Sequence, residues 1–276
     1  MKRWVSLFAL AAVSAACNPF ASRDPDPEAT ATPAPTPTPT ASASAAASSN
    51  GARSVAEQTD LFLFEYSYPA EAGRIVELAS LLDIQLEQRR EELAAEAVAA
   101  QREARADGFP YNKHRYTAEW KVVTDLPEWL SLSADVATFS GGAHGNYTVE
   151  SLVWDKEGER SIEPIELFAS PAALEQAFGD RFCEGLDRER AERRGAPLEE
   201  GEEESGNSFT DCPGVDELEI LVGSSNRRTF DRLTVYAGPY VAGPYAEGAY
   251  EIELRIDDAI LAAVKPEYRA AFGARN

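Results

Sequence analysis

The sequence predicts an α+β domain in which an antiparallel sheet packs against one long helix and one or two shorter helices. Two observations support this fold class. Residues 70–105 carry apolar side chains at steps of three and four, which is the period of an amphipathic helix. Several later segments alternate apolar and polar side chains, which is the period of half-buried antiparallel strands. A helix packed on a sheet is the simplest architecture that buries both apolar faces.

The N-terminal residues have the composition of a bacterial export signal. Two basic residues precede an apolar run at residues 4–16, which is too short to act as a stop-transfer helix. The run ends in Ser-Ala-Ala-Cys, which resembles a lipobox, although serine stands where leucine is commonest. We therefore expect residues 1–16 to be a lipoprotein signal peptide and Cys17 to be lipidated. The alternative is an ordinary cleaved signal that leaves Cys17 as a free thiol.

Residues 17–55 consist mainly of Pro, Thr, Ala and Ser and contain almost no bulky apolar residue. Such a segment cannot bury enough apolar surface to offset the entropy lost on ordering, so we expect a disordered tether. If a Gram-negative sorting rule applies, Asn18 differs from the aspartate that retains lipoproteins at the inner membrane. The expected location is then the periplasmic face of the outer membrane.

Residues 56–276 carry the patterns of the folded domain, which we divide into halves at residues 56–170 and 171–276. The first half opens with an aromatic strand at residues 61–68 that ends at a proline, and the long helix follows. Alternation then predicts strands at residues 116–124, 130–136 and 147–153.

The second half begins with a helix at residues 171–194, because Ser170 and Pro171 suit an N-cap followed by proline in the first turn. Residues 198–206 are acidic and contain glycine, which predicts a mobile loop. Further strands are expected at residues 215–222, 229–236 and 250–256, followed by a short helix capped by Asp257 or Asp258.

The cysteines predict one disulfide. If Cys17 is lipidated, Cys183 and Cys212 remain as an even pair in an exported protein. The alternative is a metal site, but neither cysteine has a histidine close to it in the sequence. We therefore expect no bound metal and no cofactor.

A glycine-rich stretch at residues 138–147 separates two of the expected strands. Its glycines, among them Gly141 and Gly142, suit a backbone that reaches positive φ or passes close to another segment. His144 has three interpretations: its ring fixes the turn by hydrogen bonding, contacts a ligand, or takes part in catalysis. The structural interpretation is favoured. The other histidine, His114, lies between two basic residues and is expected on the solvated surface.

Tyrosines on tight turns supply a second set of candidates. Tyr240 and Tyr245 occupy two Gly-Pro turns, and Tyr147 ends the glycine-rich stretch. Tyrosines on rigid turns suit a protein or glycan interface, whereas the alternative is that these rings cap the open end of the sheet. The candidate binding residues are Gly141, Gly142, His144, Tyr147, Tyr240 and Tyr245.

Several motifs resemble one family of extracytoplasmic domains. Phe-Ser-Gly-Gly-Ala-His-Gly at residues 139–145 is followed by Val-Trp-Asp at 153–155 and Pro-Ile-Glu-Leu-Phe at 164–168. The Gly-Pro-Tyr turns at 238–248 resemble the second half of that family, so the match covers roughly residues 61–272. The family is found ahead of the catalytic domain of PdaC-type peptidoglycan deacetylases and in the outer half of RsiV, a lysozyme-sensing anti-sigma factor.

The resemblance implies a binding domain and not a deacetylase. The catalytic half of a PdaC-type deacetylase holds its metal with an aspartate and two histidines, and the matching residues cover the accessory domain alone. By the resemblance to RsiV, a lysozyme-like hydrolase is the partner that the family suggests.

The net charge of −21 limits the partners further. Nucleic acid and anionic lipid surfaces repel such a chain, whereas a basic protein is attracted to it. The alternative is that the acidity only keeps an exported domain soluble.

The sequence thus predicts a non-catalytic, monomeric envelope lipoprotein that binds peptidoglycan, another cell-wall component or a basic cell-wall-active protein. No His-Glu-x-x-His or Gly-x-Ser-x-Gly pattern occurs, so no catalytic residue is assigned. Two alternatives stay open: a hydrolase of wall glycan or its acyl groups that uses His144, and a purely structural lipoprotein.

Overall fold

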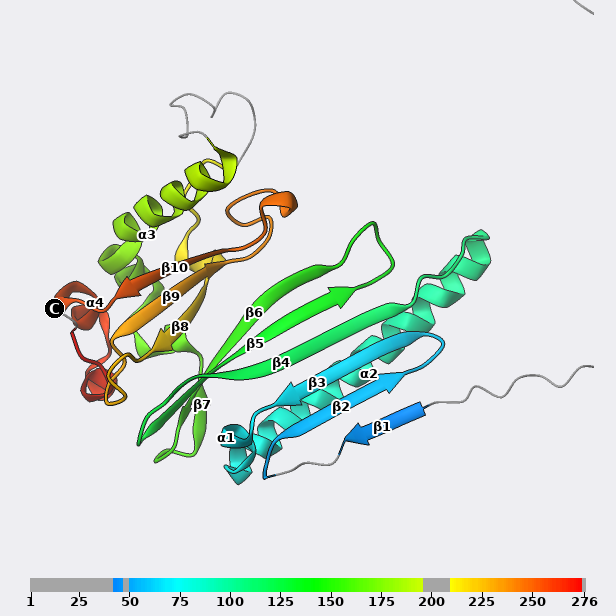
Figure 1. Cartoon of the computed structure of the whole chain (residues 1–276), viewed down its shortest axis with the longest axis horizontal. Coiled ribbons are helices and arrows are strands. Elements are labelled where there is room, and N and C mark those ends of the chain that lie inside the picture. Colours follow the sequence, from blue (N-terminus) through cyan, green and yellow to red (C-terminus); the bar gives the residue numbers. More distant parts are fainter. Residues whose placement is uncertain (1–41, 47–49, 196–208, 275–276) are drawn as a thin grey trace, which may run out of the picture. The chain divides into compact units, whose positions relative to one another are not determined.

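The computed structural model describes residues 42–46, 50–195 and 209–274 (Figure 1). The chain divides into two units after residue 38, and the described residues all belong to the second unit. The expected signal peptide, Cys17 and most of the expected tether lie outside the described residues. The acidic segment predicted at residues 198–206 lies outside them as well.

Within the described part of the chain, seven strands form one sheet in the order in which they follow one another in the sequence. Neighbouring strands are antiparallel, except that β3 and β4 are parallel. The expected antiparallel sheet is corrected at this pair, because a helix connects the two strands and returns the chain in the same direction. The strands are β1 (Ser42–Ala46), β2 (Arg53–Gln58), β3 (Phe62–Tyr68), β4 (His114–Asp125), β5 (Trp129–Phe139), β6 (Asn146–Asp155) and β7 (Arg160–Ile162).

One face of this sheet is covered by α2 (Val76–Asp107), which follows the short α1 (Ala70–Gly73) (Figure 1). The predicted single helix at residues 70–105 is therefore interrupted. Gly73 lies so close to Gly51 that a Cβ there would be 1.6 Å from the Gly51 carbonyl oxygen, which holds the first turn beside β2. The apolar stripe of α2 packs on the sheet through Leu78, Leu82, Leu86, Leu93 and Ala97.

Strands lie within residues 17–55, where the sequence predicted only a tether. β1 pairs with β2, with Ser42 opposite Gln58 and Ala46 opposite Ser54. Backbone groups make the hydrogen bonds of a strand pair, so a Ser/Ala segment can join a sheet edge without bulky apolar side chains. The folded part of the chain thus begins before residue 56.

The second half of the chain contains a smaller antiparallel sheet with the strand order β10-β9-β8. Its strands are β8 (Glu219–Gly223), β9 (Arg232–Ala237) and β10 (Tyr250–Arg255). Its helices are α3 (Pro171–Arg194), α4 (Asp258–Ala263) and the 3-10 helices η1 (Pro164–Leu167), η3 (Val215–Glu217), η4 (Tyr245–Glu247) and η5 (Pro266–Ala271). The predicted caps are confirmed, because Ser170 caps α3 and Asp257 caps α4.

The described residues bury two hydrophobic cores. One lies between α2 and the larger sheet and includes Phe64 and Trp120. The other includes Phe178 of α3 together with Val235 and Ile252 of the smaller sheet. The α+β fold class is confirmed, with the strands divided between two sheets in place of the single expected one.

A disulfide joins Cys183 of α3 to Cys212, with the Cα atoms 5.6 Å apart. The predicted pairing is confirmed. In the part of the chain that the structure describes, no helix is both long enough and apolar enough to cross a membrane.

Candidate binding surface

The glycine-rich stretch forms the turn that joins β5 to β6. Thr138 of β5 pairs with Asn146 of β6, so the residues between them close the hairpin. A Cβ at Gly145 would lie 2.8 Å from the carbonyl oxygen of Thr138, which is closer than real Cβ contacts allow. The close approach explains this glycine and leaves the neighbouring His144 exposed on the turn.

His144, Tyr147, Tyr240 and Tyr245 meet at this turn, and we call them the aromatic cluster. The His144 ring stacks on Tyr245 with the ring centres 4.0 Å apart, and Tyr147 meets Tyr245 edge-on at 6.1 Å. The Tyr240 hydroxyl lies 3.2 Å from Nε2 of His144, although 96 positions separate the two residues in sequence. The fold thus brings together four candidate residues from two distant turns.

Hydrogen bonds define the state of the His144 ring. Nδ1 lies 2.8 Å from the carbonyl oxygen of Gly145, which only accepts hydrogen bonds, so Nδ1 carries a proton. In the neutral ring, Nε2 then accepts from the Tyr240 hydroxyl. The ring therefore links the two turns, and His144 as a whole remains exposed to solvent. Both non-catalytic interpretations of His144 fit this geometry.

Tyr240 has an unusual backbone conformation. Its φ of 69° lies in the left-handed region, which residues other than glycine rarely adopt. The Tyr240 amide donates to the carbonyl oxygen of Gly243 at 3.0 Å, which closes the turn. The side chain is nevertheless 52% exposed, so burial in a core does not account for the strain. Such strain is typical of positions shaped for function.

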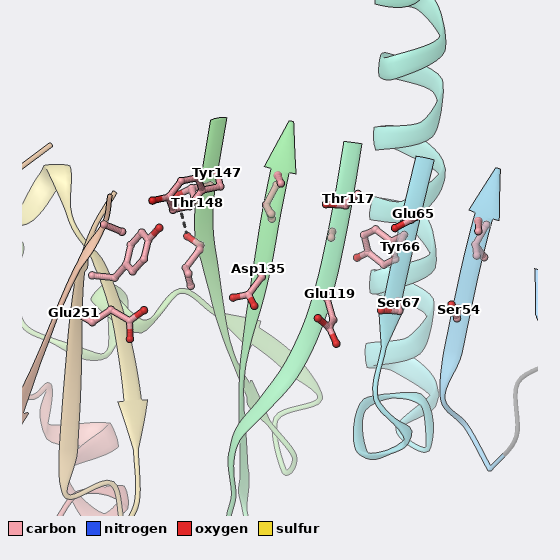
Figure 2. A pocket seen from close by; sticks show the side chains of 18 residues that line it. Ser54, Glu65, Tyr66, Ser67, Thr117, Glu119, Asp135, Tyr147, Thr148 and Glu251 are labelled. Carbon is pink, nitrogen blue, oxygen red and sulfur yellow. Dashed lines mark hydrogen bonds between the residues drawn. The ribbon is translucent and has the colours of Figure 1, made fainter. Parts of the chain in front are cut away.

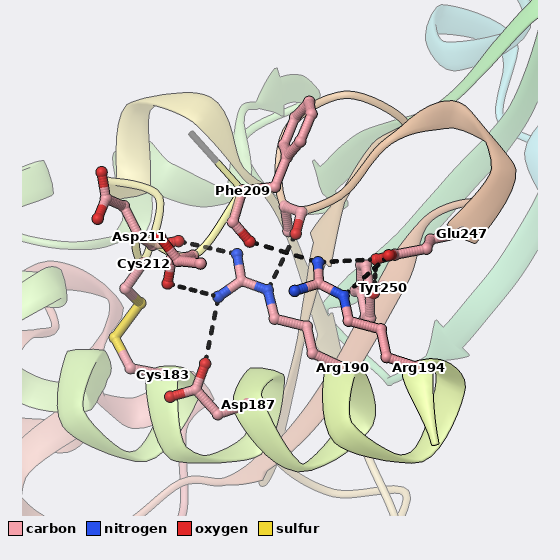
Figure 3. Close-up of polar contacts among 11 residues, drawn as sticks. Cys183, Asp187, Arg190, Arg194, Phe209, Asp211, Cys212, Glu247 and Tyr250 are labelled. Carbon is pink, nitrogen blue, oxygen red and sulfur yellow. Dashed lines mark hydrogen bonds and ion pairs between the residues drawn. A yellow bond between two sulfur atoms is a disulfide. The ribbon is translucent and has the colours of Figure 1, made fainter. Parts of the chain in front are cut away.

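Arginines near the end of α3 hold the turn that carries the two late tyrosines (Figure 3). Arg190 is fully buried, and its guanidinium donates to the carbonyl oxygen of Ala242 at 2.9 Å. Arg194 donates to both carboxylate oxygens of Glu247, at 2.8 and 3.0 Å. Arg193 donates to the Glu247 carbonyl oxygen at 2.7 Å. These hydrogen bonds from α3 thus fix the position of the turn.

Glu247 is ionised in this network. Burial alone would raise its pKa, but hydrogen bonds from Arg194 and Tyr250 outweigh burial and hold the pKa below the usual 4.5. The carboxylate therefore keeps its contacts with the helix throughout the neutral pH range.

The disulfide anchors the same network. Arg190 also donates to the carbonyl oxygens of Thr210, at 3.1 Å, and Asp211, at 2.8 Å (Figure 3). The next residue, Cys212, is bonded to Cys183 in α3. One buried side chain thus connects the disulfide segment to the tyrosine turn.

A groove of about 680 Å³ lies beside the aromatic cluster, and we call it the sheet groove (Figure 2). It lies between the smaller sheet and the face of the larger sheet that α2 leaves open, with β2 to β6 as its floor. Tyr147 belongs to both the cluster and the groove, so the two surfaces are continuous. The lining includes Glu65, Glu119, Asp135, Tyr147, Tyr236 and Glu251.

The sheet groove is acidic. None of the described residues that line it is basic, and four of them are carboxylates. Tyr236 lies between Glu219 and Glu251 on neighbouring strands. Burial, together with the nearby Tyr147, Glu251 and Asp135, raises the pKa of Tyr236 to about 12. The phenol is therefore neutral at physiological pH, within a surface of negative charge.

Two candidate glycines lie outside the aromatic cluster. The carbonyl oxygen of Gly141 accepts from the Asn112 side chain at 3.2 Å, and a Cβ at Gly142 would meet nothing within 4 Å. The prediction for His114 was wrong, because this residue is only 4% exposed and stacks on Tyr111. His114 begins β4 and points to the buried side of the sheet. Its basic neighbours in the sequence had suggested a position on the solvated surface.

Sequence reasoning missed the sheet groove. Its carboxylates occupy alternate strand positions that look like ordinary solvent-facing residues, and only the overall acidity signalled them. In the described residues, no hydrogen bond joins His144 to a carboxylate, and no group of three His, Cys, Asp or Glu residues is placed to hold a metal ion.

The exposed cluster and the groove define an α+β domain with a continuous surface suited to binding. The family model described as Deacetylase PdaC matches residues 55–147, which run from β2 through α2 to the start of β6. The resemblance to the PdaC-type family that the sequence predicted is confirmed over these residues.

Solved structures similar to this chain include two DUF3298 family proteins. One, from Bacteroides fragilis, has a TM-score of 0.44 and 16% identity and covers 79% of this chain and 89% of its own. The other, from Pseudomonas aeruginosa, has a TM-score of 0.47 and 15% identity and covers 83% of this chain and 99% of its own. No curated protein matches the chain.

Proposed function

We propose that this protein is a lipid-anchored component of the bacterial envelope that binds a basic cell-wall-active protein, such as a lysozyme-like hydrolase, without catalysis. The observation that carries the proposal is the meeting of His144, Tyr147, Tyr240 and Tyr245 in one exposed cluster. Tyrosines offer large, rigid contact areas and are enriched at protein interfaces. A net charge of −21 speeds association with a basic partner.

Peptidoglycan itself is the second candidate ligand, because sugar rings also stack on exposed tyrosines. Salt separates the two candidates. Attraction between an acidic and a basic protein weakens as ionic strength rises, whereas the stacking of a neutral oligosaccharide does not. The negative charge around the aromatic cluster favours the basic protein.

Calorimetric titration of the purified soluble protein with hen lysozyme tests the proposal. We expect binding at low ionic strength that weakens with added salt, and a loss of about tenfold or more in affinity for Tyr240→Ala, as for an interface hot spot. Phe109→Ala is the matched control, because Phe109 is an aromatic residue that is 70% exposed outside the cluster. No binding at low salt, or equal affinities for Tyr240→Ala and the wild type, would contradict the proposal.

The rival function is a wall hydrolase that uses His144. It is tested by metal analysis of the protein and by turnover assays on wall fragments before and after His144→Ala. Turnover that disappears with the imidazole would replace the binding function by an enzymatic one.

A further inference from the structure

We propose that the sheet groove takes an extended segment of polypeptide rich in lysine and arginine. This inference deepens the proposed function, on which it rests, because the segment would belong to the basic partner that the aromatic cluster contacts. The inference names the part of the partner that the groove would hold, from the charge and the shape of the groove.

The floor of the groove has room for an extended chain. It crosses strands β2 to β6, whose spacing gives a width of about 19 Å, enough for about six residues in extended conformation. The floor is made largely of small side chains, among them Ser54, Ala56, Ser67, Thr117 and Ala137. A peptide backbone can therefore lie close to the sheet.

The carboxylates on the floor of the groove lie where they can bind a cationic side chain. Glu119 and Asp135 are direct cross-strand partners on β4 and β5, an arrangement that is unfavourable for two carboxylates. Lys121, two residues along β4 on the same face, lies 2.6 Å from Asp135 and 3.2 Å from Glu119. The protein thus already places one ammonium group against this pair. Glu65 and Glu251 extend the negative charge beyond it.

The walls add contacts that suit long basic side chains. Tyr147 and Tyr236 line the groove, and the Tyr147 ring, which is 37% exposed, offers a face against which the aliphatic and cationic parts of lysine or arginine pack favourably. The Ser151 hydroxyl donates to Glu219 at 2.9 Å and joins the two sheets near this wall. The groove therefore has an aromatic side and an acidic floor.

Charge selects the basic polypeptide among the possible occupants. Nucleic acid and anionic lipid would be repelled by the carboxylates, and a second copy of this chain carries the same net charge of −21. The residues of this chain at 196–208 contain five glutamates and no basic side chain, so they do not complement the groove.

Fluorescence anisotropy of the full soluble protein with a labelled peptide of alternating serine and lysine tests the inference. The matched peptide replaces each lysine by glutamate. We expect salt-sensitive binding of the lysine peptide only, and a loss of about tenfold for the double variant Glu119→Gln/Asp135→Asn. Ala137→Lys, which puts a cation on the floor, should weaken binding similarly.

The control is Glu96→Gln/Glu103→Gln, which changes the net charge equally at exposed positions of α2. We expect it to bind the peptide as the wild type does, with thermal melting confirming that each variant is folded. Equal losses for the control and the groove variants, unchanged binding by the groove variants, or no binding at low salt would each overturn the inference.

The variant Tyr240→Ala tests this inference independently of the proposed function. Tyr240→Ala should leave the affinity for the lysine peptide unchanged while it weakens lysozyme binding. If lysozyme binding depends on Tyr240 but the peptide does not bind, the groove inference fails and the proposed function stands. If the peptide binds in the groove but lysozyme does not bind, the proposed partner is wrong.

Discussion

Glu219 shows how a single buried carboxylate shapes stability. Burial raises its pKa above the usual 4.5, the hydrogen bond from Ser151 partly offsets this, and Glu150 and Glu163 raise it further. A raised carboxyl pKa means that the folded state holds the proton more tightly than the unfolded state. Its ionisation therefore destabilises the fold as the pH rises above the ordinary carboxyl pKa.

Glu219→Gln should thus stabilise the protein at neutral pH, because the amide oxygen can still accept from Ser151 while the buried charge is removed. The gain should shrink as the pH falls toward the usual carboxyl pKa. Urea unfolding of the wild type and the variant at neutral and at mildly acidic pH measures both effects. A stability difference that is independent of pH would show that folding does not shift the pKa of Glu219.

At the level of residues, the sequence predicted which aromatic residues could form a binding surface, but it did not predict that they lie together in the fold. His144 and Tyr240 were recognised separately from their glycine and proline neighbours, yet their hydrogen bond depends on how two turns meet across the fold. Tyr236 and Tyr250 lie close to Tyr240 in the sequence but are 4% and 0% exposed. Neighbouring residues do not determine which tyrosines face solvent, because tertiary packing does.

At the level of elements, the contact between α3 and β10 depends on a glycine. A Cβ at Gly185 would lie 2.7 Å from Cγ2 of Ile252, so the helix approaches the strand more closely than a side chain permits. We expect Gly185→Ala to destabilise the protein by about 1–3 kcal/mol through overpacking. Gly179→Ala on the same helix, with its nearest atom 3.8 Å away, should instead stabilise by about 0.5–1 kcal/mol. Denaturant midpoints of the two variants test this opposition, and a shift in the same direction would contradict it.

The elements themselves were largely predictable, because hydrophobic period is a local property. Both long helices and most of the strands appear where the period indicated them. The sequence did not predict that β3 pairs with β4 in parallel or that the strands form two sheets. Alternation of apolar and polar residues shows which face of a strand is buried, but it does not show which strand lies beside it. β1 was missed because its Ser/Ala composition carries no apolar signal at all.

At the level of the whole molecule, the proposed anchor makes a prediction that does not depend on the binding surface. Cys17→Ala should move the protein from the membrane fraction to the soluble fraction, because the lipid chains would be lost. Immunoblots of fractionated cells with metabolic labelling by a fatty acid measure this. Cys212→Ala is the control, since it removes a cysteine of the disulfide and leaves the anchor in place. Equal membrane retention of Cys17→Ala and the wild type would exclude the lipoprotein assignment.

The disulfide has a consequence for the integrity of the surface. A protease that cut the chain once after the end of α3 and before Phe209 would produce two fragments still linked covalently, and Arg190 would still bridge Asp211 to the turn at Ala242. Such a nicked molecule would migrate as one species until reduced. The interval between the end of α3 and Phe209 is accordingly a place where foreign sequence could be inserted without detaching the tyrosines from their helix.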